Sequence, residues 1–452
     1  MSTGIRDVER TNILQRSNKF DIHYIPPELW ASIFEEVVLS DDTTCAPMLL
    51  LHICHFWREI ALTTPQLWTK LDVNGDSDPQ QVDFFLQNSM PLRIDIMVDL
   101  VKSYDHPPLI VFHAHLHRIR SLDICSNFVT YAQHALSLIG QNQAAPALQI
   151  LSVTITQEPT TLTPGSEAGF ITLKSPFSAV PVIATLTLPL CHLPRNTDIL
   201  LCSPSLKHLI INSPSYFFPA LNWNWVYSAV RAVQNLQSLT FKGPPAIMRP
   251  SLSTMLVQGT YVCEAPYLTS IDITAPEWGI KIMRDIIAPL LKKVRIDALG
   301  QREQFAPITP TGFQLGSTWS TESESVAKAL LHLSRTSPSI THIEMRGIDL
   351  PGSGQFTACS LLGGAFPVLE YLTLDDVNVD DSAFAESSSS MPNLKYLELV
   401  ACPNISGSAL LSFVANRRGK LQQLVLRRCS GIKHSYYLKS LSEITALRVL
   451  TE

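Results

Sequence analysis

The chain has 452 residues, of which 46% are hydrophobic and only 16% are charged. This composition provides enough apolar material for a large core and excludes a globally disordered chain. The net charge of -5 argues against a polyanion-binding surface, which needs clustered Lys and Arg, so no nucleic-acid partner is expected. The length leaves two options, several compact domains or one elongated repeat array.

Residues 1–21 read as a polar N-terminal tail without the apolar stretch of a secretory signal. No apolar run reaches membrane-spanning length, so we expect a protein of the cytoplasm, the nucleus or both, with no membrane partner. Thiols stay reduced in these compartments, and no two of the nine cysteines form a Cys-x-x-Cys pair. A disulfide framework and a structural zinc site are therefore not expected.

Residues 22–73 have apolar side chains at helical spacing. Pro26 and Pro27 suit the first turn of a helix, and Glu28 lies favourably near the positive end of its dipole. This helix, of about three turns, has an apolar stripe formed by Leu29, Ile33, Phe34, Val37 and Val38. A second helix after Pro47 would place on one face Leu50, Ile53, Cys54 and Trp57.

A short third element contains Leu67 and Trp68. Three short helices over about fifty residues form too small a core to be stable alone. We therefore expect this unit to pack against a neighbour or a partner and to expose an apolar stripe.

These residues resemble an F-box in order and spacing, especially the F-box-like version common in mushroom-forming fungi. The resemblance implies that the module binds the Skp-type adaptor of a cullin-based ubiquitin ligase. Carried over position by position, the implied adaptor-binding residues are Ile25, Pro26, Pro27, Glu28, Leu29, Ile33, Phe34, Leu50, Ile53, Cys54, Trp57, Arg58, Leu67 and Trp68. Two positions depart from the family, since the usual leading Leu is Ile25 and a position often held by Lys or Arg is His55.

Residues 74–116 read as a connecting segment, and from residue 117 to 452 a short motif recurs. The motif has an apolar residue, two variable ones, an apolar, a variable and a third apolar residue. Its twelve copies begin at Ile119, Leu148, Ile183, Leu206, Leu236, Leu268, Leu291, Ile340, Leu369, Leu394, Leu421 and Leu447. In so apolar a chain this pattern would arise by chance on the order of ten times, so it needs independent support.

Proline provides that support, because it lies two positions before the first apolar residue in eight copies. These residues are Pro146, Pro181, Pro204, Pro266, Pro289, Pro338, Pro367 and Pro392. We expect each proline to stop the preceding segment and set an extended approach to a strand. Eight residues after the start of four copies stand Asn127, Cys191, Cys402 and Cys429. In this the pattern resembles leucine-rich repeats, which commonly place Asn or Cys there, and the resemblance implies that these side chains satisfy backbone groups where the strand turns away.

The repeated pattern resembles leucine-rich repeats, and its tenth and eleventh copies are similar to the cysteine-containing repeats often fused to F-boxes. The resemblance implies an α/β fold, a small three-helix F-box followed by an irregular solenoid with a curved parallel sheet and helices on its convex side. Residues 298–337 widen one gap and read as a surface insertion. A different α/β domain over residues 120–300 is the competing interpretation.

In a repeat array of this kind the side chains between the apolar strand positions project from the concave surface. Aromatic and Arg side chains there make good interaction hot spots for a client protein. The candidate client-binding residues are Lys293, Arg295, His342, Glu344, Arg346, Tyr371, Tyr396, Glu398 and Arg427. The alternative is an ordinary solvated strand surface.

Two further clusters favour structural roles. His113, His115 and His117 alternate within a predicted helix, which would leave only His113 and His117 on one face, so no metal site is predicted. An aromatic cluster is predicted to pack a helix rather than bind a ligand, and it comprises Tyr216, Phe217, Phe218, Trp223, Trp225 and Tyr227.

The sequence has no Gly-rich phosphate loop, nucleophile elbow or His-Glu-x-x-His pair, so neither an enzyme nor a cofactor is expected. The resemblances together predict the substrate-recognition adaptor of a Skp-cullin-F-box ubiquitin ligase, with an unknown client. The alternative is a repeat scaffold that does not join a ligase.

Overall fold

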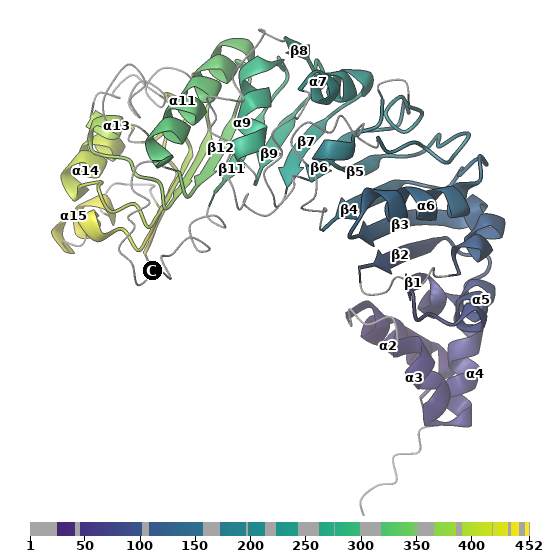
Figure 1. Cartoon of the computed structure of the whole chain (residues 1–452). Coiled ribbons are helices and arrows are strands. Elements are labelled where there is room, and N and C mark those ends of the chain that lie inside the picture. Colours follow the sequence, from purple (N-terminus) through teal and green to yellow (C-terminus); the bar gives the residue numbers. More distant parts are fainter. Residues whose placement is uncertain are drawn as a thin grey trace, which may run out of the picture.

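The computed structural model describes residues 25–40, 46–101, 108–156, 172–195, 198–212, 223–242, 262–274, 276–298, 318–348, 350, 366–385, 391–417, 419–432, 435–442 and 448–451. Within these residues, short N-terminal helices precede one fourteen-stranded sheet. Figure 1 shows the strands lining the inside of an arc, with the larger helices outside it. The predicted α/β class and the curved parallel sheet are confirmed.

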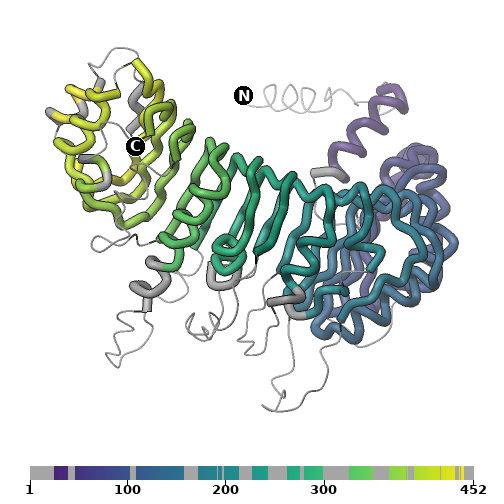
Figure 2. Tube along the Cα trace, turned by 90° about the horizontal axis from the view of Figure 1, so that it is seen from above, coloured from purple at the N-terminus to yellow at the C-terminus, as the bar shows by residue number. Residues whose placement is uncertain are grey.

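Every neighbouring pair of strands in this sheet is parallel, and the strands follow one another in sequence order. Figure 2 shows successive turns of the chain lying side by side, as in a solenoid. The strands of the sheet are β1 (Lys70–Asn74), β2 (Ile94–Leu100), β3 (Ile119–Ser126), β4 (Ile150–Ile155), β5 (Thr185–Pro189), β6 (His208–Asn212), β7 (Ser238–Lys242), β9 (Ser270–Ile273), β11 (Lys293–Asp297), β12 (His342–Arg346), β13 (Tyr371–Asp375), β14 (Tyr396–Val400), β15 (Gln423–Arg427) and β16 (Arg448–Thr451).

Helices and short 3-10 turns connect the strands, and a separate two-stranded sheet pairs β8 (Cys263–Glu264) with β10 (Ile286–Ile287). The first four helical elements are α2 (Pro27–Ser40), α3 (Ala46–Ile53), α4 (His55–Thr63) and η2 (Pro65–Trp68). The others are α5 (Pro79–Asn88), η3 (Leu109–Arg118), α6 (Val129–Gly140), η4 (Leu190–His192), α7 (Trp223–Ala232), α9 (Pro276–Asp285), α11 (Thr318–Thr336), α13 (Ser382–Ala385), α14 (Gly407–Ala415), η5 (Ser430–Ile432) and α15 (Ser435–Ser442). None of the helices in the described residues is long and apolar enough to cross a bilayer.

The N-terminal helices differ from the prediction at one point. The first helix begins at Pro27 as expected, but the predicted second helix is two helices, because α3 ends at Ile53 and α4 begins at His55. Between them Cys54 is extended (φ -158°), and its Sγ accepts the amide N–H of Trp57 at 3.4 Å. Cysteine is not among the usual N-cap residues, so the apolar spacing alone did not reveal this break.

Trp68 joins these helices to the sheet. Its ring is 1% exposed, and its Nε1 donates to the carbonyl of Ala61 at 2.8 Å. The ring also packs edge-on against two rings of α5, with centroids 5.3 Å from Phe84 and 5.0 Å from Phe85. Only Thr69 separates η2 from β1. The helical unit therefore shares one core with the first strands, as its small size required.

All twelve predicted strand positions carry a strand, and in ten copies the strand begins two residues after the first apolar residue of the motif. The prolines act differently from the prediction, because they lie in tight turns rather than in an extended approach. In the Pro146 copy, for example, the N–H of Leu148 donates to the carbonyl of Ala145 at 3.2 Å. Proline fixes the φ angle that the second residue of such a β-turn needs.

The far ends of the strands also repeat. Four residues that directly follow a strand have a positive φ angle. They are Gly347 (65°), Asp376 (52°), Ala401 (49°) and Arg428 (54°). This left-handed conformation is the bend by which the chain leaves the sheet, and it is costly for residues other than Gly. Because it depends on backbone geometry, nothing in the apolar pattern revealed it.

The residues predicted to satisfy backbone groups after the strands do so wherever their side chains are described. The Asn127 side-chain amide donates to Val101 O at 3.0 Å, and Cys402 Sγ donates to Leu374 O at 3.6 Å. Cys429 Sγ likewise lies 3.4 Å from Leu399 O. The side chain of Cys191 lies outside the described residues.

These contacts predict a pattern of thiol reactivity. Burial raises the pKa of Cys402 to about 12 and that of Cys263 to about 11, whereas Cys54 and Cys202 are exposed. The thiolate is the reactive form, so a maleimide at pH 8 should label Cys402 and Cys263 on the order of 100-fold more slowly than Cys54 and Cys202. Peptide mapping by mass spectrometry measures this, with protein unfolded in urea as the control. Equal labelling of Cys402 and Cys54 in the folded protein would contradict it.

Two strands, β1 and β2, precede the first strand that the sequence predicted. In β2 the residues alternate between buried and more exposed. A Pro-x-Leu turn also precedes β1, since the N–H of Leu67, two residues after Pro65, donates to the carbonyl of Thr64 at 3.2 Å, so this strand could have been identified from the sequence. Within the predicted insertion at 298–337, the structure describes helix α11, and residues 299–317 lie outside the described part.

Candidate functional sites: an apolar helical face and a polar concave surface

The first candidate site is an apolar face on two N-terminal helices that pack against each other. On α2 three exposed apolar side chains are spaced four residues apart, and on α3 two more are spaced likewise. We call the five residues the apolar face, and they are Leu29, Ile33, Val37, Leu49 and Ile53, with 44% to 62% of each residue exposed. The expected exposed apolar stripe is therefore present.

The stripe predicted on the first helix divides between the surface and the core. Phe34 and Val38 turn inward, where the ring of Phe34 lies 4.8 Å from that of Trp57 and 5.7 Å from that of Trp30. Apolar spacing could not separate the two halves, because both satisfy the helical period. The side that packs against α4 becomes core, and the other side stays in water.

The fourteen residues implied as adaptor-binding fall into two groups. Five are core or packed against it, namely Phe34, Leu50, Trp57, Leu67 and Trp68. Eight are exposed, Pro26, Pro27, Glu28, Leu29, Ile33, Ile53, Cys54 and Arg58, and Ile25 is half-buried. Two exposed apolar residues lie outside these fourteen, Val37, which the sequence placed on the apolar stripe, and Leu49, which it missed although the four-residue spacing from Ile53 could have identified it.

The second candidate site lies on the inner surface of the arc. Alternation along β9 and β11–β15 buries every second side chain under the helices and leaves the others on the opposite face. We call these outward side chains, together with Glu370 and Lys395 beside the strands, the concave polar surface. It brings together all nine predicted client-binding residues, on five consecutive strands of the sheet.

Strand register arranges these side chains in rows. Lys293, His342, Tyr371 and Tyr396 are register partners in the first row. Arg295, Glu344 and Glu398 lie in the second row, and Arg346 and Arg427 in the third. Partners in neighbouring strands are about 4.8 Å apart, so each row is a continuous line of contacts.

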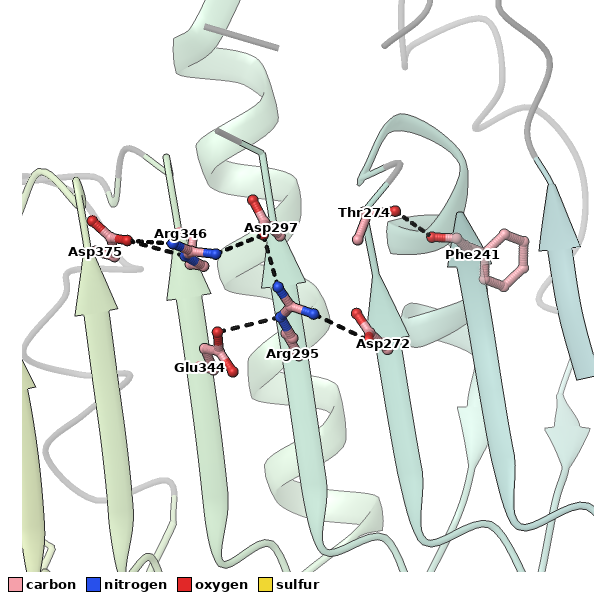
Figure 3. A network of polar contacts seen from close by, with 8 residues as sticks. All are labelled: Phe241, Asp272, Thr274, Arg295, Asp297, Glu344, Arg346 and Asp375. Atoms are coloured by element: carbon pink, nitrogen blue, oxygen red, sulfur yellow. Dashed lines mark hydrogen bonds and ion pairs between the residues drawn. The ribbon is translucent and has the colours of Figure 1, made fainter. Parts of the chain in front are cut away.

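An ion-pair network occupies the second and third rows (Figure 3). The guanidinium of Arg295 lies 3.4 Å from Asp272, 3.0 Å from Asp297 and 3.2 Å from Glu344. Figure 3 shows these side chains on the face of the sheet opposite helix α11. Arg295 is therefore surrounded by carboxylates from its own strand and from both neighbouring strands.

Arg346 extends the same network. It lies 3.3 Å from Asp297 and 2.8 Å from Asp375, and the hydrogen bond that it donates to Asp375 raises the pKa of this guanidinium. The sequence prediction missed Asp297 and Asp375, because it treated the arginines as free hot spots rather than as neighbours of carboxylates. The two arginines hold strands together as well as facing the solvent.

A double-mutant cycle tests the strength of this network. The side chains of Arg346 and Asp375 are 34% and 11% exposed, so their attraction is only partly screened by water. We expect a coupling free energy of about 1 kcal/mol from urea unfolding of R346A, D375A and the double variant. The same cycle on His55 and Glu59, whose side chains are 82% and 64% exposed, should show no measurable coupling. Additive effects at Arg346 and Asp375 would contradict the prediction.

Aromatic side chains line the first row. The His342 and Tyr371 rings stack with centroids 4.2 Å apart and planes 7° apart, and Tyr396 follows with its centroid 6.0 Å from that of Tyr371. Burial, followed by the nearby charge of Lys293, lowers the pKa of His342, so this ring is neutral near pH 7. Burial and the hydrogen bond to Glu398 raise the pKa of Tyr396 to about 12.

The sequence predicted structural roles, not ligand sites, for the histidine segment and the aromatic cluster. The histidine segment forms the 3-10 helix η3 rather than the predicted α-helix, and this tighter helix buries Leu109 and Phe112, which lie three residues apart. Across the described residues, no group of three His, Cys, Asp or Glu is placed to hold a metal ion.

Of the aromatic cluster, Tyr227 is buried in α7, and its hydroxyl donates a hydrogen bond to the carboxylate of Asp285. The side chains of Tyr216, Phe217, Phe218, Trp223 and Trp225 lie outside the described residues.

In comparisons with known proteins, no protein-family model matches the chain, and no curated protein is significantly similar to it.

Proposed function

We propose that this protein is the substrate-recognition adaptor of a Skp-cullin-F-box ubiquitin ligase. In this proposal α2, α3, α4 and η2 are an F-box that binds a Skp-type adaptor, and the sheet is a leucine-rich-repeat solenoid that binds a client protein. The protein itself catalyses nothing and needs no cofactor. It links the client to the ligase.

The apolar face is the observation that carries the proposal. Its five large side chains lie in the segment whose motifs resemble an F-box, and they are exposed on two short helices. Burying an exposed Leu, Ile or Val contributes about 1.5–3 kcal/mol, so a partner that covered several of them would bind firmly. Five exposed apolar side chains on one small helical unit favour a protein partner over open solvent.

The packing of Trp68 supports the same role. Because this side chain joins the helices to α5, and one residue separates η2 from β1, the helices that carry the apolar face share one continuous core with the sheet. An adaptor protein has to hold its client at a defined position relative to the ligase. A shared core meets that requirement better than a flexible linker would.

Three repeated features support the leucine-rich-repeat assignment. They are the proline turns before the strands, the sequence-ordered parallel sheet and the Asn or Cys side chains that bind backbone carbonyls after the strands. In such arrays the concave surface binds partners. The concave polar surface is the corresponding region here.

The test is co-purification of the full-length protein with a Skp-type adaptor and a cullin, followed by mass spectrometry of the bound proteins. The expected result is a stoichiometric adaptor together with cullin and one or more clients. One observation favours the alternative scaffold, since His55, where the family often has a cation, pairs instead with Glu59 at 3.5 Å. Recovery of clients without any adaptor would support that alternative.

A further inference from the structure

The turns that precede the strands are connected by hydrogen bonds from one copy of the repeat to the next. In four copies the residue just before the first apolar residue of the motif is Ser or Asn, and its side chain donates to the carbonyl of the proline in the preceding copy. We call this series the turn ladder, and its bonds run from Ser205 to Pro181, Asn235 to Pro204 and Ser339 to Pro289, each at 2.8 Å, and from Asn393 to Pro367 at 3.0 Å. Each bond satisfies a turn carbonyl that no strand or helix satisfies.

In the sixth and seventh copies the turn ladder is interrupted at two successive turns. The residues at the donor position are Tyr267 and Leu290, and the carbonyls that lack their donors are those of Gln234 and Pro266. In the described part of the chain, no hydrogen bond reaches either carbonyl. The two turns lie side by side, because the strands β8 and β10 that lead into them are paired. Tyr267 and Leu290 are 55% and 49% exposed, so large apolar side chains stand in water where other copies have Ser or Asn.

A pocket of about 540 Å³ lies at the first of these turns. We call it the rim pocket, and its lining residues are Arg231, Val233, Gln234, Val262, Glu264 and Pro266. The two residues whose carbonyls lack a donor are therefore both part of its wall. The pocket lies where α7 ends and β8 begins, and Figure 1 shows these two elements on the outer side of the arc, away from the concave polar surface.

The polar groups of the rim pocket favour a ligand that donates hydrogen bonds. The guanidinium of Arg231 already donates to the carbonyl of Val262. The carboxylate of Glu264 and the carbonyls of Gln234 and Pro266 accept no hydrogen bond from the described residues. With one Arg and one Glu the lining has no net charge, so a neutral donor fits it better than a strongly acidic or basic group. The main chain of an extended peptide supplies such donors at regular spacing, with side chains between them that can enter a pocket of this size.

We propose that the rim pocket binds an extended segment of a partner protein. The segment places a large apolar side chain in the pocket beside Val262, which is 47% exposed, and it donates main-chain N–H groups to the carbonyls of Gln234 and Pro266. It thus supplies the two bonds that the turn ladder lacks, and it covers the apolar side chains of Tyr267 and Leu290. The rim pocket is separate from the apolar face and from the concave polar surface, so this inference does not rest on the proposed function.

The experiment uses the full-length protein and an array of random 12-residue peptides. Each retained peptide is synthesised again in two series, one with single backbone N-methyl groups and one with single alanine replacements, and affinities are measured by fluorescence polarisation. Methylation at two particular amides should weaken binding by about three- to tenfold, because each loses one hydrogen bond. Alanine in place of one large apolar residue should weaken binding by about tenfold or more.

Two variants complete the turn ladder within the protein and so compete with the peptide. Leu290→Asn and Tyr267→Asn introduce the donor that Asn235 and Asn393 supply in other copies. Each should weaken the parent peptide by about tenfold, and each should cancel the effect of methylating one of the two amides, because the carbonyl is already bonded. Val368→Asn is the matched control, the same change at the exposed donor position of the ninth copy, where the ladder is also interrupted, and it should leave the affinity unchanged. Thermal unfolding checks that all three variants fold.

Several outcomes would overturn the proposal. They are an array that retains no peptide, an affinity that no single N-methyl group changes, or equal peptide binding by the wild type and Leu290→Asn, which would place the peptides elsewhere on the protein. Self-association of the wild type that is lost in Leu290→Asn would assign the rim pocket to a second copy of the chain instead. Adaptor binding does not enter this test, so the proposed function stands or fails separately.

Discussion

Changing Ile33 to Glu is expected to abolish binding of a Skp-type adaptor, with an affinity loss on the order of 100-fold or more and an almost unchanged unfolding temperature. Ile33 lies in the middle of the α2 stripe and is 44% exposed, so Glu is tolerated in the free protein. In a complex the new carboxylate would be buried without a partner, which costs several kcal/mol. Isothermal titration calorimetry with the purified adaptor, together with thermal unfolding, measures both quantities.

The matched control for this variant is Ile110→Glu. Ile110 is 63% exposed on η3, so the same chemical change falls on an apolar residue outside the apolar face and should leave adaptor binding intact. Trp57→Ala is a poorer test, because the ring packs between Trp30 and Phe34 and its loss would disturb the helices themselves. Full adaptor affinity in Ile33→Glu would exclude the apolar face as the binding site.

Changing Trp68 to Ala should lower the free energy of unfolding by about 3–5 kcal/mol, the largest stability loss we expect from one substitution in the N-terminal unit. The variant removes a ring that is 1% exposed and two edge-on aromatic contacts. It also leaves the carbonyl of Ala61 without its indole donor. Urea unfolding followed by circular dichroism measures the loss.

Two control variants separate the contributions of Trp68. Trp68→Phe retains a ring but loses the hydrogen bond, so its effect should be intermediate. Leu49→Ala, on a residue 62% exposed, should change stability by less than about 0.5 kcal/mol. Hydrogen exchange adds a positional readout, since Trp68→Ala should reduce protection in both α4 and β1. If only α4 lost protection, the helices and the sheet would not share a core.

The sequence was most informative where a local rule and a periodic pattern coincided. The apolar motif located all twelve predicted strands, and a proline precedes it in eight of them, because a turn residue and a buried strand both leave a local signal in the sequence. The start of α2 at Pro27 was predicted for the same reason. The strands β1 and β2, which precede the first predicted copy of the motif, were missed.

Reasoning from the sequence was less accurate where the outcome depended on neighbours distant in the chain. Asp375 lies 29 residues from Arg346, and only the strand register brings the two side chains to 2.8 Å. Cys54 likewise ends one helix and caps the next, a role that cysteine rarely takes. The sequence prediction treated Arg295 and Arg346 as free hot spots, whereas the structure places both in an ion-pair network.

The sequence by itself determined the class of the fold, the positions of most strands and the presence of an exposed apolar stripe, because each depends on local periodicity and turn chemistry. Only the tertiary structure decided which half of that stripe stays in water and which cations of the concave polar surface are neutralised. Helical and strand periods specify that a side chain faces a given direction, but not what it meets there. Packing of α2 against α4 buried Phe34 and left Ile33 outside, and the register of β9 to β12 placed Lys293 beside Ser270 and His342 rather than beside an acidic register partner.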